Sequence, residues 1–190
     1  EKFIESTFPS LIKHLKQFEQ KAKKRDDQGD YWWELRHCSY YPEFEKEKVV
    51  WGNISYDSEF CFVDKGIYIN APANIIISNE TSIKYLIAQM NSKIFDWQFK
   101  QVGIFLGHAY EWKKQYVEQV RIPPITPANQ SILKQIEALV DKILSSKKAA
   151  STGSATSPQA DTSQWEMEID RLVYQLYELT EEEIRIVEGK

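Results

Sequence analysis

The stretch Lys48-Val49-Val50-Trp51 begins a series of short segments that are rich in β-branched and aromatic residues. Such residues favour strands that pack one face against a core. Turn-forming residues, for example Gly52-Asn53 and Ala71-Pro72, separate the segments. The pattern predicts a mixed sheet of short strands at 48–51, 58–63, 66–70 and 74–78.

Amphipathic helices are predicted on both sides of these strands. Before them, apolar residues recur every three or four positions from Pro9 to Arg25. After them, helix-capping residues at 79–82 precede a helix with apolar positions up to Phe95. A looser stretch at 97–112 is expected to turn back before a last strand at 117–122. The fold class is therefore predicted as α+β.

The C-terminal part predicts a pair of long helices. Thr126-Pro127 begins the first, which carries a near-heptad apolar stripe from Ile132 to Leu144. A second striped helix contains Ile169 to Leu176, and Thr180 to Glu183 form a capping box for a short last helix. The small and polar stretch 149–163 predicts a flexible connector, so the two long helices should pair antiparallel. We therefore expect a connecting helix at 1–29, an α/β domain at 30–126 and a helical spacer at 127–190.

Composition limits the functional classes. The 190 residues carry a net charge of −4, but residues 165–190 hold eight acids and three bases, so the other 164 residues are nearly neutral. A nucleic-acid surface must then arise from local clustering of charge. Cys38 and Cys61 predict reduced thiols of a cytoplasmic protein, and no membrane span is expected. The absence of an initiator Met predicts a fragment of a longer protein.

The sequence lacks the common catalytic motifs. It has no phosphate-binding glycine loop, no nucleophile elbow and no zinc-binding His pair. Glu111-x-Lys113 has the form of half a nuclease site without its acidic partner, and Ile122-Pro123-Pro124-Ile125 shares only its prolines with the catalytic loop of DNA amino-methyltransferases. We therefore predict no catalytic residue, cofactor or metal in this chain.

Basic residues alternate with aromatic rings from 30 to 57, as expected for a nucleic-acid surface, because Arg reads guanine, Lys holds phosphate and rings stack on bases. Alternative interpretations are that the rings are core, that 43–48 is a solvated edge strand, and that Arg36 braces the aromatic cluster. The basic run Lys21 to Arg25 either complements a helix end or contacts phosphate. The predicted DNA contacts are Arg36, Tyr40, Tyr41, Lys46, Lys48 and Tyr56, with Lys93, Lys100, Lys113 and Lys114 as phosphate contacts.

Several segments resemble the C-terminal specificity domain of type IIG restriction-modification enzymes. Tyr31-Trp32-Trp33-Glu34-Leu35-Arg36, followed by 44–51, is similar to the start of that domain. Residues 85–93 resemble its Asn-Ser-Lys helix, 120–125 its exit into the spacer helix, and 168–188 its C-terminal end. The likeness covers 31–189, and the arrangement also resembles half of a type I specificity subunit. One departure is Glu178, where family members often carry Gly.

The resemblance implies a target recognition domain that binds double-stranded DNA and leaves the chemistry to a neighbour. An upstream methyltransferase domain of the same chain would bind S-adenosylmethionine and methylate a flipped adenine. A fused endonuclease, where present, would use Mg²⁺. The alternative function is a protein–protein docking module of a phage-defence DNA methyltransferase, in which the helical pair and the aromatic surface hold another subunit.

Overall fold

A computed structural model describes residues 2–152 and 161–190, without the side chains of 151 and 152. The chain divides into two compact units, Glu1–Pro42 and Glu43–Lys190, which we describe separately. In the first unit, Arg25 holds the loop that follows it by hydrogen bonds to the carbonyl oxygens of Trp32 and Glu34. The domain boundaries predicted after residues 29 and 126 stay predictions.

The first unit contains three short helices, α1 (Lys2–Thr7), α2 (Pro9–Lys16) and α3 (Glu19–Ala22). The continuous helix predicted at 9–25 is interrupted between α2 and α3. There the amides of Gln17 and Phe18 donate to carbonyl oxygens only three residues earlier, at 3.3 and 2.8 Å, which tightens the last turn of α2.

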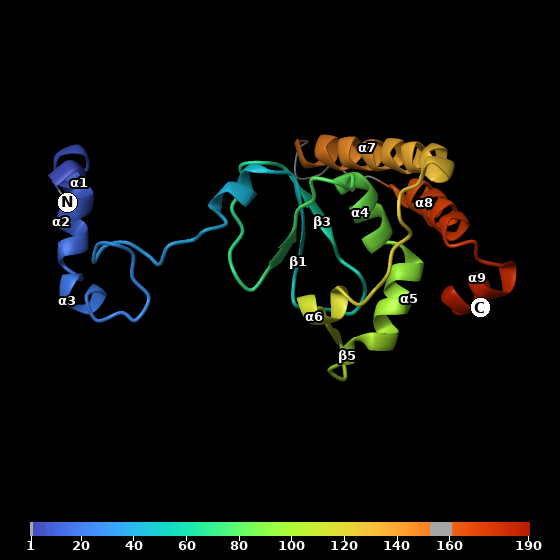
Figure 1. Ribbon diagram of the computed structural model, residues 1–190, viewed down its shortest axis with the longest axis horizontal. Coiled ribbons are helices and arrows are strands. Elements are labelled where there is room, and N and C mark those ends of the chain that lie inside the picture. Colours follow the sequence, from blue (N-terminus) through green and yellow to red (C-terminus); the bar gives the residue numbers. More distant parts are fainter. Residues whose placement is uncertain (1, 153–160) are drawn as a thin grey trace. The chain divides into compact units, whose positions relative to one another are not determined.

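The second unit contains two small antiparallel sheets (Figure 1). In the first, β1 (Lys48–Trp51) lies between β3 (Cys61–Val63) and β4 (Asn74–Ile76), with Val49 opposite Phe62 and Ile76. In the second, β6 (Tyr110–Glu111) lies between β2 (Ile54–Ser55) and β5 (Ile104–Phe105). The predicted α+β fold of short strands and packed helices is confirmed.

Two predicted strands are wrong, and two are shorter than predicted. Residues 66–70 form no strand, because Gly66 turns the chain at a φ of +78°. The strand predicted at 117–122 is replaced by α6 (Lys114–Val117) and an irregular segment, since the amides of Val117 and Glu118 make helical hydrogen bonds. Only 61–63 of the strand predicted at 58–63 is paired, and only 74–76 of the strand predicted at 74–78.

The helix predicted up to Phe95 is in fact two helices, α4 (Ile83–Met90) and α5 (Lys93–Val102). The chain breaks at Asn91-Ser92 because Ser92 caps α5, accepting a hydrogen bond from the amide of Phe95. The Asn91 side chain meanwhile bonds the backbone N–H and C=O of Phe60, at 2.9 and 2.8 Å. Residues 97–102 are therefore helical rather than loose.

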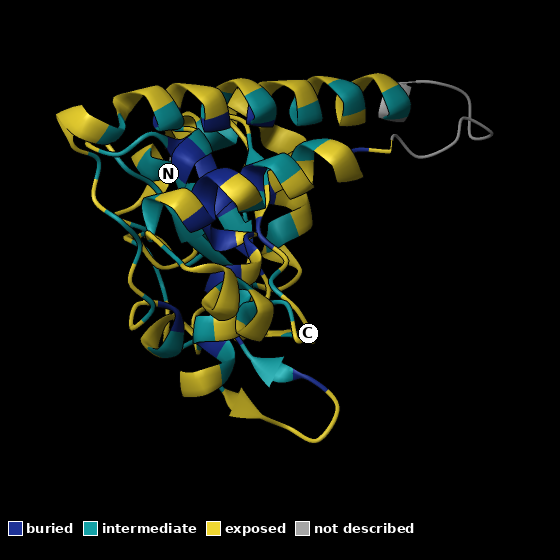
Figure 2. Cartoon of the chain, turned by 90° about the vertical axis from the view of Figure 1, so that its right-hand side faces the viewer, coloured by how far each residue is buried: buried dark blue, intermediate teal, exposed yellow. Residues whose placement is uncertain are grey.

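The C-terminal part begins with a short 3₁₀ turn, η2 (Pro127–Asn129). Three helices follow: α7 (Gln130–Thr152), α8 (Ser163–Leu176) and α9 (Glu181–Val187). The two predicted caps are confirmed, since Thr126 and Thr180 each form a capping box. Figures 1 and 2 show α7 and α8 running antiparallel, as predicted. Of the predicted connector 149–163, residues 149–152 belong to α7 and 153–160 lie outside the described residues.

The core of the second unit is centred on Trp112, which follows β6. Its ring stacks on Phe99 of α5 at 3.6 Å between centroids, and its indole N–H donates to the Ser55 carbonyl at 3.0 Å. The indole N–H of Trp51 donates to the Trp112 carbonyl at 2.7 Å. The two sheets and α5 are therefore joined at one buried residue.

Glu178 follows α8 with a positive φ of 56°, the left-handed conformation that favours glycine. The amide of Glu178 donates to the carbonyl of Gln175, and that of Leu179 to the carbonyl of Tyr174, both at 3.1 Å. These two bonds form a Schellman motif, in which Gly is the usual residue at this position. Glu178 is therefore a strained residue at a helix end that keeps both hydrogen bonds of the usual motif.

Glu178→Gly is expected to raise the free energy of unfolding by roughly 0.5–1 kcal/mol, measured by urea denaturation. Relief of the left-handed strain exceeds the greater chain entropy that Gly gives the unfolded state. Glu137→Gly inside α7 is the control, and it should lower the free energy by about 1 kcal/mol. An unchanged or lower stability of Glu178→Gly would contradict the strained conformation.

Candidate nucleic-acid interface

The loop after α3 is fixed by hydrogen bonds from side chains to backbone. One guanidinium nitrogen of Arg25 donates to the carbonyl oxygens of Trp32 and Glu34, at 2.9 and 2.7 Å. A Cβ on Gly29 would lie 2.6 Å from the Cβ of Glu34 and 2.7 Å from the carbonyl oxygen of Leu35, so only glycine fits there. We call residues 29–37 the ring–arginine loop. The Arg25 side chain, from the same unit, therefore holds the backbone of this loop.

The ring–arginine loop presents aromatic and basic side chains outward. Tyr31 and Trp33 stack at 4.8 Å with an interplanar angle of 4°, and Trp32 meets Trp33 edge-on at 84°. The Arg36 side chain is 70% exposed, and its closest carboxylate oxygen, on Asp27, is 3.8 Å away. Arg25 holds the loop and leaves Arg36 accessible, and the choice between a DNA contact and bracing of the rings by Arg36 stays open.

The neighbouring residues extend this accessible surface. His37 is also open to solvent, with a 3.2 Å contact from its Nε2 to Asp30. Tyr40 and Tyr41 are each about half exposed. A side-chain hydrogen bond to Cys38 raises the pKa of Tyr40. The predicted contacts Arg36, Tyr40 and Tyr41 thus lie on one accessible segment of the first unit.

A basic strip precedes the loop. Residues 13–25 hold six bases and one acid. Lys16 and Lys23 pair with Glu5 and Glu19, at 3.2 and 2.6 Å. Within the described part of this unit, the other three lysines make no ion pair and are exposed: Lys13, Lys21 and Lys24. Exposed and unpaired lysines can neutralise phosphates and release counterions.

The structure places Lys48 inside the second unit, so the predicted DNA contact of this residue does not hold. Its side chain is fully buried, and Nζ donates to the Asp64 carbonyl at 3.0 Å. Lys46 is more accessible but pairs with Glu43 at 2.8 Å. Contact of Lys46 with DNA stays a prediction.

Lys100 sits among two carboxylates and two rings. Its ammonium lies 2.7 Å from Asp57 and 2.6 Å from Asp96, and 5.0 and 5.8 Å from the ring centres of Tyr56 and Tyr110. Burial alone would lower the pKa of Lys100, but the hydrogen bonds to Asp57 and Asp96 outweigh it and leave the pKa raised. Two carboxylates on one ammonium leave no net positive charge for a phosphate. Lys100 therefore anchors Tyr56 rather than offering its own charge.

The other predicted phosphate contacts are ion-paired to different extents. Lys93 lies 3.2 Å from Glu188, and Lys113 lies 2.7 Å from Glu111, whose hydrogen bond raises the lysine pKa. Lys114 keeps 80% of its side chain exposed, with a loose 3.9 Å contact to Glu118. These contacts stay predictions, and Lys114 is the most accessible of them.

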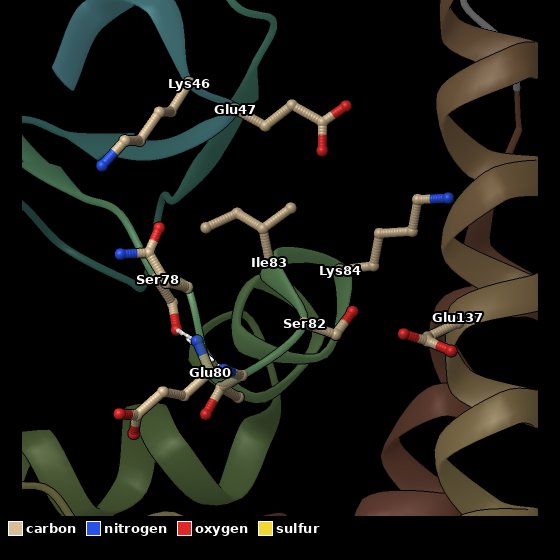
Figure 3. A pocket seen from close by; sticks show the side chains of 10 residues that line it. Lys46, Glu47, Ser78, Glu80, Ser82, Ile83, Lys84 and Glu137 are labelled. Atoms are coloured by element: carbon tan, nitrogen blue, oxygen red, sulfur yellow. Dashed lines mark hydrogen bonds between the residues drawn. The ribbon is translucent and has the colours of Figure 1, made fainter. Parts of the chain in front are cut away.

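A polar pocket of about 450 Å³ lies where the loop before α4 faces α7 and the two residues that precede β1 (Figure 3). Ser78 closes one side, its hydroxyl accepting hydrogen bonds from the amides of Glu80 and Thr81 at 3.3 and 2.8 Å. The charged lining residues are two lysines and three glutamates: Lys46, Lys84, Glu47, Glu80 and Glu137. Excess negative charge makes this pocket unsuited to a phosphate, so it is not part of the proposed interface.

Other kinds of site are absent from the described residues. Within 2–152 and 161–190, no three side chains of His, Cys, Asp or Glu gather as a metal site would require. Among the helices that the structure describes, none has the length and apolar content needed to cross a membrane. Both cysteines, Cys38 and Cys61, are free thiols.

Comparison with known proteins accounts for a surface of this kind. A search of the curated proteins found no match. The sequence pattern of a family described as the TaqI-like C-terminal specificity domain matches residues 8–124, which include the basic strip, the ring–arginine loop and both small sheets. A specificity domain recognises DNA for a restriction-modification enzyme and is not itself catalytic. Because the match covers more than half of the chain, this protein belongs to the TaqI-like C-terminal specificity domain family and is a DNA-recognition module of a restriction-modification enzyme.

Proposed function

We propose that this chain reads a short DNA sequence for a type IIG restriction-modification enzyme, and that the ring–arginine loop is its principal reading surface. The proposal rests on the different positions of two arginine side chains. Arg25 fixes the loop backbone through the carbonyls of Trp32 and Glu34, while the Arg36 guanidinium stays open to a ligand.

The chemistry of the loop suits base recognition. An arginine makes two hydrogen bonds to guanine O6 and N7 in the major groove, and each such pair contributes about 1–3 kcal/mol of discrimination. The stacked rings of Tyr31 and Trp33 provide a flat surface for contact with bases or sugars. A loop already held by internal hydrogen bonds loses little entropy when DNA binds.

The parent enzyme is part of the same proposal. An upstream methyltransferase domain would bind S-adenosylmethionine and methylate an adenine, and a fused endonuclease would use Mg²⁺. The family supports this assignment, since a specificity domain needs a catalytic partner to act on the DNA it recognises. The setting would be the cytoplasm, where the enzyme would act in phage defence.

The salt dependence of binding tests the proposal. The logarithm of the association constant should fall linearly with the logarithm of salt concentration, with a slope of about −0.9 per phosphate contacted. Replacing Lys13, Lys21 and Lys24 together with Ala should make the slope shallower, by about 0.9 for each phosphate that the variant no longer neutralises. The measurement is fluorescence anisotropy with a labelled duplex enriched from a random library.

The matched control replaces three exposed basic residues of α7 and α8, which are Lys134, Lys142 and Arg171. The total charge change is the same, so an equally shallow slope in the control would place the phosphate contacts elsewhere. Binding that does not depend on salt, or no binding of duplex DNA, would overturn the proposed function.

Protein docking is supported by a different observation in the first unit. Phe8, Leu11 and Phe18 are each about half exposed, although they belong to the apolar stripe of the first helices. Such a stripe normally packs against another surface. The salt titration separates the two functions, because an apolar docking contact releases few counterions.

A further inference from the structure

The hairpin formed by β5 and β6 projects from the body of the second unit, and Figure 2 shows it at the lower edge. Its turn is tight, since the Leu106 amide donates to the Ala109 carbonyl at 2.7 Å and leaves Gly107 and His108 as the two connecting residues. Gly107 has a φ of +89°, which a hairpin turn of this length requires. The tip is therefore a tight two-residue turn.

The projecting side chains are apolar. Ile104, Phe105 and Leu106 are 45%, 51% and 42% exposed. Ile54 lies on β2, which pairs with the other side of β6, and Tyr56 follows β2; each is 60% exposed. We call these five residues the hairpin surface. Ile54 and Ile104 both lie opposite Glu111 and so share one face of the sheet, whereas Phe105 lies opposite Tyr110 on the other face. Large apolar side chains exposed on both faces of a hairpin mark a contact with another molecule.

Few charges surround the tip of the hairpin. Residues 97–110 contain no acidic residue. The carboxylates on the neighbouring elements are already paired with lysines: Asp57 and Asp96 with Lys100, and Glu111 with Lys113, all at 2.6–2.7 Å. Asp57 and Asp96 exceed the single charge of Lys100 by one, so one excess negative charge lies beside Tyr56 rather than on the hairpin tip.

We infer that this hairpin enters a groove of the bound duplex and places Phe105 and Leu106 against the bases. This inference rests on the proposed function and assigns it a second contact element, in the other unit of the chain. The major groove is wide enough for a two-stranded ribbon, and apolar side chains contact thymine methyl groups or wedge between base steps. The ligand is double-stranded DNA.

Replacing Phe105 and Leu106 together with Ala should weaken binding of the enriched duplex about 10- to 100-fold, because two apolar side chains lose their burial. The slope of the salt titration should not change, since no cation is removed. The matched control is Met167→Ala with Ile186→Ala, two exposed apolar residues on α8 and α9, and its affinity should equal that of the wild type.

Photo-crosslinking gives an independent readout. The enriched duplex is made with 5-iodouracil in place of thymine, irradiated with the full chain and digested with trypsin. Crosslinked DNA is expected on the peptide 101–113, which lies between Lys100 and Lys113 and contains the whole tip. The double Ala variant should lose this crosslink and keep those on the first unit.

The outcomes separate the two proposals. If the wild type shows no salt-dependent binding of duplex DNA, the proposed function fails and the inference fails with it. If the wild type binds, but the double variant binds equally well and 101–113 carries no crosslink, only the inference is overturned. The hairpin surface would then belong to a protein contact.

Discussion

Phe99→Ala is expected to lower the free energy of unfolding of the second unit by about 3–5 kcal/mol. The Phe99 side chain is fully buried, and its ring stacks on Trp112 at 3.6 Å with an interplanar angle of 6°. Removing the ring takes away apolar burial and leaves a cavity beside the indole. Because the Trp112 indole also donates to the Ser55 carbonyl, the second sheet should loosen together with α5.

Urea denaturation followed by tryptophan fluorescence measures this effect. Phe105→Ala is the matched control, since Phe105 follows the same helix but is 51% exposed, and its replacement should change the free energy of unfolding by less than about 0.5 kcal/mol. A decrease below about 1 kcal/mol for Phe99→Ala would mean that the stack with Trp112 does not form. The stability of Phe105→Ala also shows whether weaker DNA binding after replacement of the hairpin residues reflects a change at the interface rather than unfolding.

Much of the fold could be predicted because local chemistry determines it. Val49 and Trp51 belong to a β-branched and aromatic run that does form the central strand β1. Thr126 and Thr180 begin their helices where capping residues predict it. In these places the propensity of the segment and its tertiary environment favour the same structure.

The second sheet could not be predicted from the sequence, for a physical reason. Its strands have two residues each, too few for an alternating pattern, and Ile104 and Phe105 are both exposed. The break before α5 was also missed, because Asn91 and Ser92 act through partners, Phe60 and Phe95, whose positions depend on the fold. Tertiary contacts determined both features.

The candidate site shows the same limit. The exposure of Arg36 agrees with the predicted role, because a charged residue beside rings tends to stay solvated. Lys48 behaves differently, since its ammonium reaches a backbone carbonyl, that of Asp64, which no side-chain pattern encodes. The same applies to Arg25, whose three hydrogen bonds all go to carbonyl oxygens, so no sequence pattern indicated that it holds the loop.

Arg36→Ala is expected to reduce sequence discrimination by about 1–3 kcal/mol, the contribution of one bidentate contact to a base. Discrimination is the ratio of association constants for the enriched duplex and for variants with one base pair changed. The effect should be concentrated at one position of the site, because a single guanidinium contacts one base pair. The variant should keep the wild-type unfolding free energy, since the Arg36 side chain is 70% exposed.

Arg36→Lys distinguishes reading from simple charge attraction. Lysine keeps the positive charge but lacks the planar fork, so discrimination should fall nearly as far as in Arg36→Ala while the salt slope stays at the wild-type value. Arg171→Ala, which removes an exposed arginine from α8, should leave discrimination intact. Equal weakening on every duplex, with full recovery in Arg36→Lys, would make Arg36 a phosphate contact and leave base reading to other residues.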